Sequence, residues 1–121
     1  MDLSISQMMQ LQKELFEAHG CKWSPMEPEY GTEFLLYITE EIGEVISVVT
    51  KKGHQAVMDD PVVRDAFLEE MSDVLMYHME ILLRFHVTAD EISQAYQKKH
   101  DHNVGRNYKK QYEELLHDGE K

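Results

Sequence analysis

Two short acidic runs hold the residues whose types and spacing best suit chemistry. The first run contains Glu40, Glu41 and Glu44, and the second contains Glu70 and Asp73. Residues three or four positions apart share one face of a helix, so each run presents an edge of two carboxylates. These edges are Glu41 with Glu44 and Glu70 with Asp73. If the two helices pack edge to edge, four carboxylates surround one space, which is the arrangement of a divalent-metal site.

The apolar sequence around both runs favours a bound cation. Residues 34–38 and 45–49 flank the first run, and residues 67–68 and 74–77 flank the second. Like charges at this spacing destabilise a helix by about 0.2–0.5 kcal/mol per pair, and desolvating a carboxylate between helices costs roughly several kcal/mol more. The alternative is that the acids line a solvated face, as most charged runs do. Oxygen ligands without Cys or His predict Mg²⁺, with Mn²⁺ as a substitute.

Length and composition exclude several classes of protein. A chain of 121 residues suits a single domain over 1–121, and its net charge of −11 argues against binding nucleic acid or an anionic membrane surface. One cysteine, Cys21, cannot form an internal disulfide. The first residues lack the pattern of a signal peptide, and every apolar run is too short to cross a bilayer. We therefore expect a cytoplasmic protein.

Hydrophobic periodicity predicts an all-α protein built as a four-helix bundle. The expected main helices span about 4–18, 32–52, 61–85 and 88–104, with a long loop between the first two and a short charged helix near 107–116. Asp60 is the expected N-cap of the third helix, and Gly53 lies just beyond the second. Gly43, inside the second helix, costs about 1 kcal/mol relative to Ala, which the close approach of another helix or of a ligand would explain.

With these elements in place, the chain resembles the MazG-like nucleotide pyrophosphohydrolases of the all-α NTP pyrophosphatase superfamily. That family carries Glu-Glu-x-x-Glu on one helix and Glu-x-x-Asp on the next, which here are residues 40–44 and 70–73. A third element of Lys, Asn and Arg corresponds to Lys99, Asn103 and Arg106, followed by Tyr108. The resemblance runs from about residue 32 to residue 108.

The resemblance implies Mg²⁺-dependent hydrolysis of a nucleoside triphosphate between its α and β phosphates, with deoxynucleotides foremost. It implies metal ligands at Glu41, Glu44, Glu70 and Asp73, with Glu40 and Glu41 as catalytic candidates. Glu40 would orient the attacking water or contact a second ion. The implied phosphate-binding and substrate-binding residues are Lys99, Asn103, Arg106 and Tyr108.

The resemblance also implies a base pocket formed partly by the segment before the first acidic helix. Trp23, Tyr30 and Tyr37 are the candidates for stacking on the base, whereas the alternative for such aromatic residues is a plug over the core. Family members form dimers or dimers of dimers. The apolar third helix also exceeds what one small bundle buries, so a homo-oligomer is expected.

Other functions fit parts of this pattern. Phosphoribosyl-ATP pyrophosphohydrolase shares the bundle and the acidic motifs. Substrate competition would distinguish it from a MazG-like nucleotide pyrophosphohydrolase. A ferritin-like di-iron protein needs Glu-x-x-His motifs, whereas both motifs here end in an acid, Glu44 and Asp73. A non-enzymatic helical adaptor would use its glutamates only for solubility.

Overall fold

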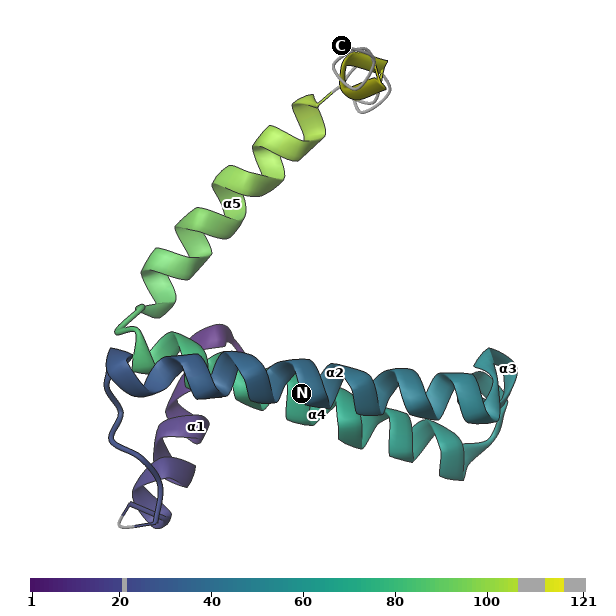
Figure 1. Cartoon of the computed structure of the whole chain (residues 1–121), viewed down its shortest axis with the longest axis horizontal. Helices are drawn as coiled ribbons and strands as arrows, with labels where there is room; N and C mark the ends of the chain where they lie inside the picture. The colour runs from purple at the N-terminus through teal and green to yellow at the C-terminus, as the bar shows by residue number, and fades with distance from the viewer. Residues whose placement is uncertain (21, 107–112, 117–121) are drawn as a thin grey trace. The chain divides into compact units, whose positions relative to one another are not determined.

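The computed structural model describes residues 1–20, 22–106 and 113–116, and the described part is helical without a strand. Its elements are α1 (Ile5–Ala18), a 3₁₀ turn η1 (Pro28–Tyr30), α2 (Gly31–Lys52), α3 (His54–Asp59), α4 (Pro61–Arg84) and α5 (Ala89–Gly105) (Figure 1). The all-α prediction is confirmed. Residues 107–112 of the expected short C-terminal helix lie outside the described residues, and residues 113–116 are helical.

The helix ends follow from local hydrogen bonds. Ser4 caps α1, since its Oγ accepts from Gln7 N at 3.1 Å and its own N–H donates to Gln7 Oε1 at 2.7 Å. Asp60 caps α4 by accepting from Val62 N at 2.9 Å. Gly53 has a φ of 86°, which favours glycine, and it separates α2 from α3. The predicted helix bounds agree with the structure to within one residue at these positions.

The six-residue helix α3 was not predicted. Six residues are too few to show a hydrophobic period, so the sequence predicts no element between Gly53 and Asp60. In the structure α3 contacts both α2 and α4, and its Val57 is buried. It therefore closes the connection between the two long helices as a packed turn.

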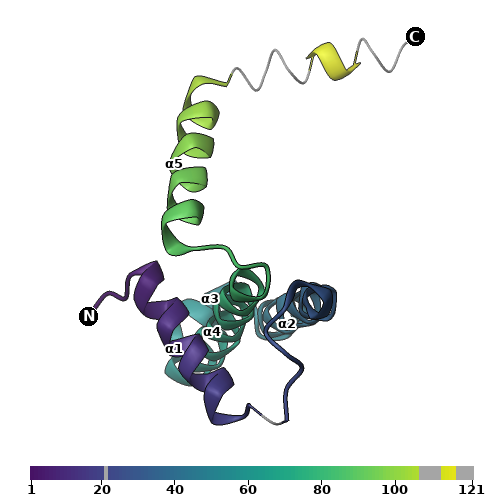
Figure 2. The ribbon, with the colours of Figure 1, turned by 90° about the vertical axis from the view of Figure 1, so that its left-hand side faces the viewer.

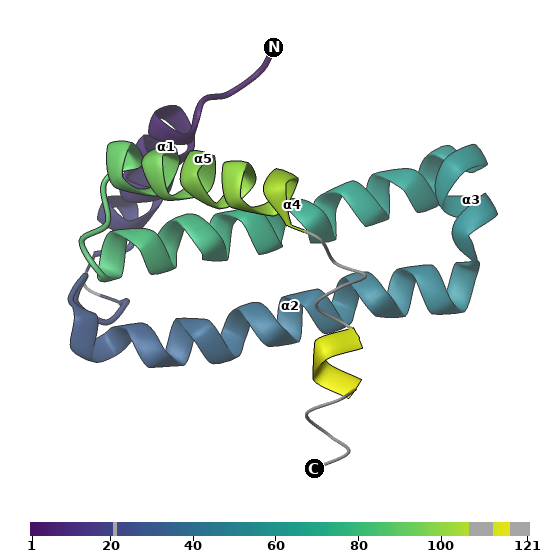
Figure 3. The same cartoon turned by 90° about the horizontal axis from the view of Figure 1, so that it is seen from above.

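The chain divides into two compact units, residues 1–89 and residues 90–121, and each is described by itself. In the first unit α2 and α4 lie side by side in opposite directions and are joined at one end through α3 (Figure 3). Helix α1 crosses α4 on the side away from α2, so α4 lies between them (Figure 2). The single domain and a bundle that includes α5 stay predictions.

Two glycines of α2 differ in their surroundings. A Cβ at Gly31 would lie 2.5 Å from the ring of Phe85, so the start of α2 depends on the absence of a side chain there. A Cβ at Gly43 would have nothing within 4 Å apart from its own helix backbone. Within the described residues nothing contacts this position, so the close approach of another helix or of a ligand at Gly43 stays a prediction.

Candidate metal site

Three carboxylates from the two long helices meet in the first unit. One oxygen each of Glu41, Glu44 and Glu70 lies within 4.8 Å of the others, a grouping that could hold a metal ion. Glu41 and Glu44 are three residues apart and share the face of α2 that Glu70 of α4 meets. Glu41 and Glu70 are partly buried, whereas Glu44 is exposed. We call these three residues the acidic triad.

Two oxygens of the acidic triad are left without a partner. Glu41 Oε2 and Glu70 Oε2 are shielded from solvent, and neither has a hydrogen-bond partner among the described residues. An unsatisfied buried polar group costs about 1–3 kcal/mol, and more if it is charged. A cation would satisfy both oxygens, so the residues present fit a metal bound through oxygen ligands. Nothing in the donor set selects Mg²⁺ over Mn²⁺.

Two residues of the acidic triad, Glu41 and Glu70, have a raised pKa. A hydrogen bond with the carboxyl of Glu44 is the main cause that raises the pKa of Glu70 to about 7, followed by burial and the charge of Glu44. Burial is the main cause that raises the pKa of Glu41, followed by the charges of Glu44 and Asp73. Without a cation Glu41 and Glu70 therefore retain protons at a pH where ordinary glutamates lose them, and a bound cation would displace these protons.

The other predicted acids lie beside the acidic triad. Asp73 is partly buried, does not belong to the close group of three, and raises the pKa of both Glu41 and Glu70 through its charge. Glu40 is exposed, and its charge adds the smallest contribution to the raised pKa of Glu41. Asp73 and Glu40 therefore lie close enough to act on the acidic triad through their charges, without belonging to it.

An aromatic cavity of about 480 Å³ adjoins the site at Asp73. Trp23 and Tyr37 both line it, together with Phe34 and Tyr77, whereas Tyr30 does not. The remaining lining residues are Gln12, Leu15, Lys22, Ser24, Glu33, Met76 and Glu80. The cavity is wide enough for a small planar ligand and offers ring faces to stack on it.

Tyr77 connects the aromatic cavity to the acids. Its ring lies 6.2 Å from that of Tyr37 and 6.1 Å from that of Phe34. Burial is the main cause that raises its pKa, and the charges of Glu41 and Asp73 add to the shift. Tyr77 therefore stays protonated, with a hydroxyl near the carboxylates.

A second hollow of about 500 Å³ lies on the other side of the acidic triad. Glu44 and Glu70 line it, as do Lys51 and Lys52 from the last turn of α2. The sequence analysis does not connect these lysines with the acidic motifs. Their spacing contained the missed signal, because Lys51 follows Glu44 by two helical turns and so shares its face.

The predicted phosphate-binding residues belong to the second unit. Lys99 and Asn103 line a hollow of about 360 Å³ on α5, together with Tyr96, His100 and Val104. Asn103 Oδ1 is shielded from solvent and has no partner among the described residues, and the backbone N–H of Arg106 donates to Asn103 O at 3.2 Å. Tyr108 lies outside the described residues.

Comparisons of the chain with protein-family models, curated proteins and solved structures found no match. No helix in the described residues is long and apolar enough to span a membrane. The fold and the site define an all-α protein whose two longest helices present an acidic triad able to hold a metal ion.

Proposed function

We propose that this protein is a Mg²⁺-dependent nucleoside triphosphate pyrophosphohydrolase of the MazG-like kind. It would cleave the anhydride between the α and β phosphates and release a nucleoside monophosphate and pyrophosphate. The observation that carries the proposal is the acidic triad with two unpartnered buried oxygens. The order of the acids in the two motifs supports the same function.

The proposed function gives each acid a role. Glu41, Glu44 and Glu70 would hold the metal, and Asp73, one turn further along α4, would supply a fourth carboxylate. The bound metal would neutralise phosphate charge and lower the pKa of a water molecule. Glu40, exposed at the rim, orients the attacking water and accepts its proton.

The hollows on both sides of the acidic triad suit the two ends of a nucleotide. A planar base fits the aromatic cavity, where the rings of Trp23 and Tyr37 offer stacking faces. The outer phosphates would point to the opposite hollow and its two lysines, Lys51 and Lys52. An acidic protein with a net charge of −11 needs such local positive charge to retain a triphosphate.

The decisive experiment measures pyrophosphate and orthophosphate released from dATP, dGTP, dCTP and dTTP, with Mg²⁺ and with a chelator. Pyrophosphate release that depends on Mg²⁺ is expected for at least one of them. Glu70→Gln should lower kcat/KM about a hundredfold or more, because it removes a metal ligand. Glu69→Gln is the matched control, since the neighbouring Glu69 is exposed and outside the acidic triad.

A wild-type protein that releases no pyrophosphate from these four substrates would contradict the proposal for deoxynucleotides. Phosphoribosyl-ATP would then be tested at the same site. If that substrate is not hydrolysed either, and Glu70→Gln changes no metal-dependent property, the acids serve only solubility. The protein is then a non-enzymatic helical adaptor.

A further inference from the structure

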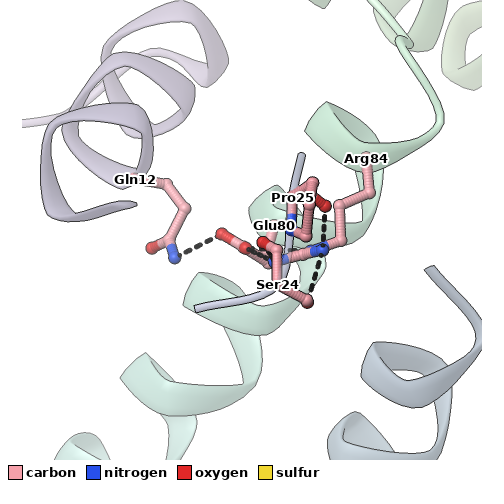
Figure 4. Close-up of polar contacts among 5 residues, drawn as sticks. All are labelled: Gln12, Ser24, Pro25, Glu80 and Arg84. Atoms are coloured by element: carbon pink, nitrogen blue, oxygen red, sulfur yellow. Dashed lines mark hydrogen bonds and ion pairs between the residues drawn. The ribbon is translucent and has the colours of Figure 1, made fainter. Parts of the chain in front are cut away.

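The most deeply buried side chains of the first unit are charged. Arg84 is 0% exposed and Glu80 is 1% exposed, and both lie on α4, outside the acidic triad. Arg84 Nε donates to Glu80 Oε1 at 3.0 Å, and Gln12 Nε2 of α1 donates to Glu80 Oε2 at 2.9 Å (Figure 4). Glu80 therefore accepts hydrogen bonds from α1 and from α4, and its negative charge compensates the buried positive charge of Arg84.

The other donors of Arg84 reach the loop between α1 and α2. Its Nη1 donates to Pro25 O at 2.7 Å and to Ser24 Oγ at 3.0 Å, and its Nη2 donates to Ser24 O at 3.2 Å (Figure 4). A guanidinium holds its donors in a rigid planar fork, so contacts with a side chain and two carbonyls restrict the loop in several directions at once. This loop segment directly follows Trp23.

Arg84 also contacts the opposite wall of the aromatic cavity. Its guanidinium carbon lies 3.8 Å from the centre of the Phe34 ring. Trp23 and Ser24 line the cavity from the loop, and Phe34 lines it from α2. One buried side chain on α4 therefore joins the loop wall to the helix wall.

From these contacts we infer that Arg84 is the positioning residue that holds Trp23 as a wall of the aromatic cavity, and thereby sets the affinity of the site for a nucleobase. The part of this inference that names a nucleobase as the ligand of the cavity rests on the proposed function. Arg84 touches neither the acidic triad nor the reacting phosphates, so it acts on binding through the loop.

A purely stabilising role is the alternative that the test must exclude. Replacing a buried ion pair by uncharged residues of similar volume is often neutral for stability. Removing one partner alone is strongly destabilising, because it leaves the other charge buried and unpaired. The double variant Glu80→Gln/Arg84→Met removes both charges together. It keeps an amide oxygen that can accept from Gln12 and removes every donor to the loop.

The test compares this double variant with the wild type. KM for the best of dATP, dGTP, dCTP and dTTP should rise about tenfold or more, while kcat changes less than about threefold, because lost ground-state binding raises KM alone. Acrylamide quenching of Trp23, the one tryptophan, should increase without any substrate present. Mn²⁺ affinity should stay unchanged, since the acidic triad is intact.

Controls keep each outcome decisive. Arg64→Met removes an exposed arginine from the same helix and should change none of these quantities. If the double variant fails to fold, Ser24→Ala removes one loop acceptor outside the helices and should raise both KM and quenching to a smaller extent. Unchanged KM and quenching in a folded variant overturn the inference. If the wild type hydrolyses no nucleotide, the proposed function fails and the quenching alone decides the role of Arg84.

Discussion

At the scale of single residues, the acidic triad opposes the folding of the metal-free protein. Glu70 has a raised pKa of about 7 in the folded state, against an ordinary value of 4.5. The folded state therefore binds more protons than the unfolded chain between these two values. The raised pKa of Glu70 therefore does not destabilise the folded state below about pH 4.5, and it destabilises the folded state fully above about pH 7.

We therefore expect the free energy of unfolding to fall as the pH rises from about 4.5 to about 7 in the absence of metal. Urea unfolding followed by circular dichroism at several pH values measures this dependence. Glu70→Gln should make this dependence shallower, because the variant has no carboxyl at position 70 to titrate. Added Mg²⁺ should raise stability most at the upper end of this range. Identical pH profiles for wild type and variant would contradict the raised pKa of Glu70.

The second hollow leads to a prediction about the substrate's outer phosphates. The double variant Lys51→Met/Lys52→Met should raise KM for a triphosphate about three- to tenfold, since exposed charge pairs contribute modestly. The effect should shrink at high salt, where such interactions are screened. Lys13→Met, on the exposed surface of α1, is the control. An unchanged KM would assign phosphate binding to other residues, with Lys99 and Arg106 tested next.

At the scale of elements, the start of α2 packs closely on the end of α4 where Gly31 contacts Phe85. A methyl group at Gly31 would lie 2.5 Å from the Phe85 ring, which is far inside van der Waals contact. The ring or the helix must move to admit it.

Gly31→Ala should therefore lower the free energy of unfolding by about 1–3 kcal/mol, measured by urea denaturation. Adding Phe85→Leu to that variant should recover part of the loss, because the smaller side chain leaves room for the methyl group. No loss in the single variant, or no recovery in the double variant, would show that this contact does not restrict packing.

At the scale of the whole molecule, the first unit exposes apolar side chains that its own helices do not cover. Leu35, Ile42 and Ile46 lie along one face of α2 and are about half exposed, and Leu68 and Leu75 of α4 are similarly exposed. Gly43, with open space at its Cβ position, lies one helical turn before Ile46. Such a surface suits a second copy of the chain, as the family resemblance implies.

Light scattering at micromolar concentration should thus give the mass of a dimer or a larger oligomer. Ile42→Lys/Ile46→Lys should reduce that mass to the monomer, because burying two charges at the interface is unfavourable. Val62→Lys, at an exposed position near the start of α4, should leave the mass unchanged. A monomeric wild type would contradict the prediction.

What the sequence determined is mainly local. Ser4, Asp60 and Gly53 define helix ends through hydrogen bonds and dihedral preferences within a few residues, which is why those bounds were predictable. The pairing of Glu41 with Glu44 on one face also follows from helical spacing alone.

The tertiary structure decided contacts between residues far apart in the chain. Glu44 raises the pKa of Glu70 only because α2 and α4 pack in one register, and the spacing within either helix contains no such information. Arg84 contacts Ser24 across sixty positions, and the Glu80–Arg84 spacing alone suggested no more than an ordinary helical ion pair. Helical spacing predicted that the acids of each motif share one helix face. The aromatic cavity beside them, in contrast, depends on how the loop between α1 and α2 folds back onto α4.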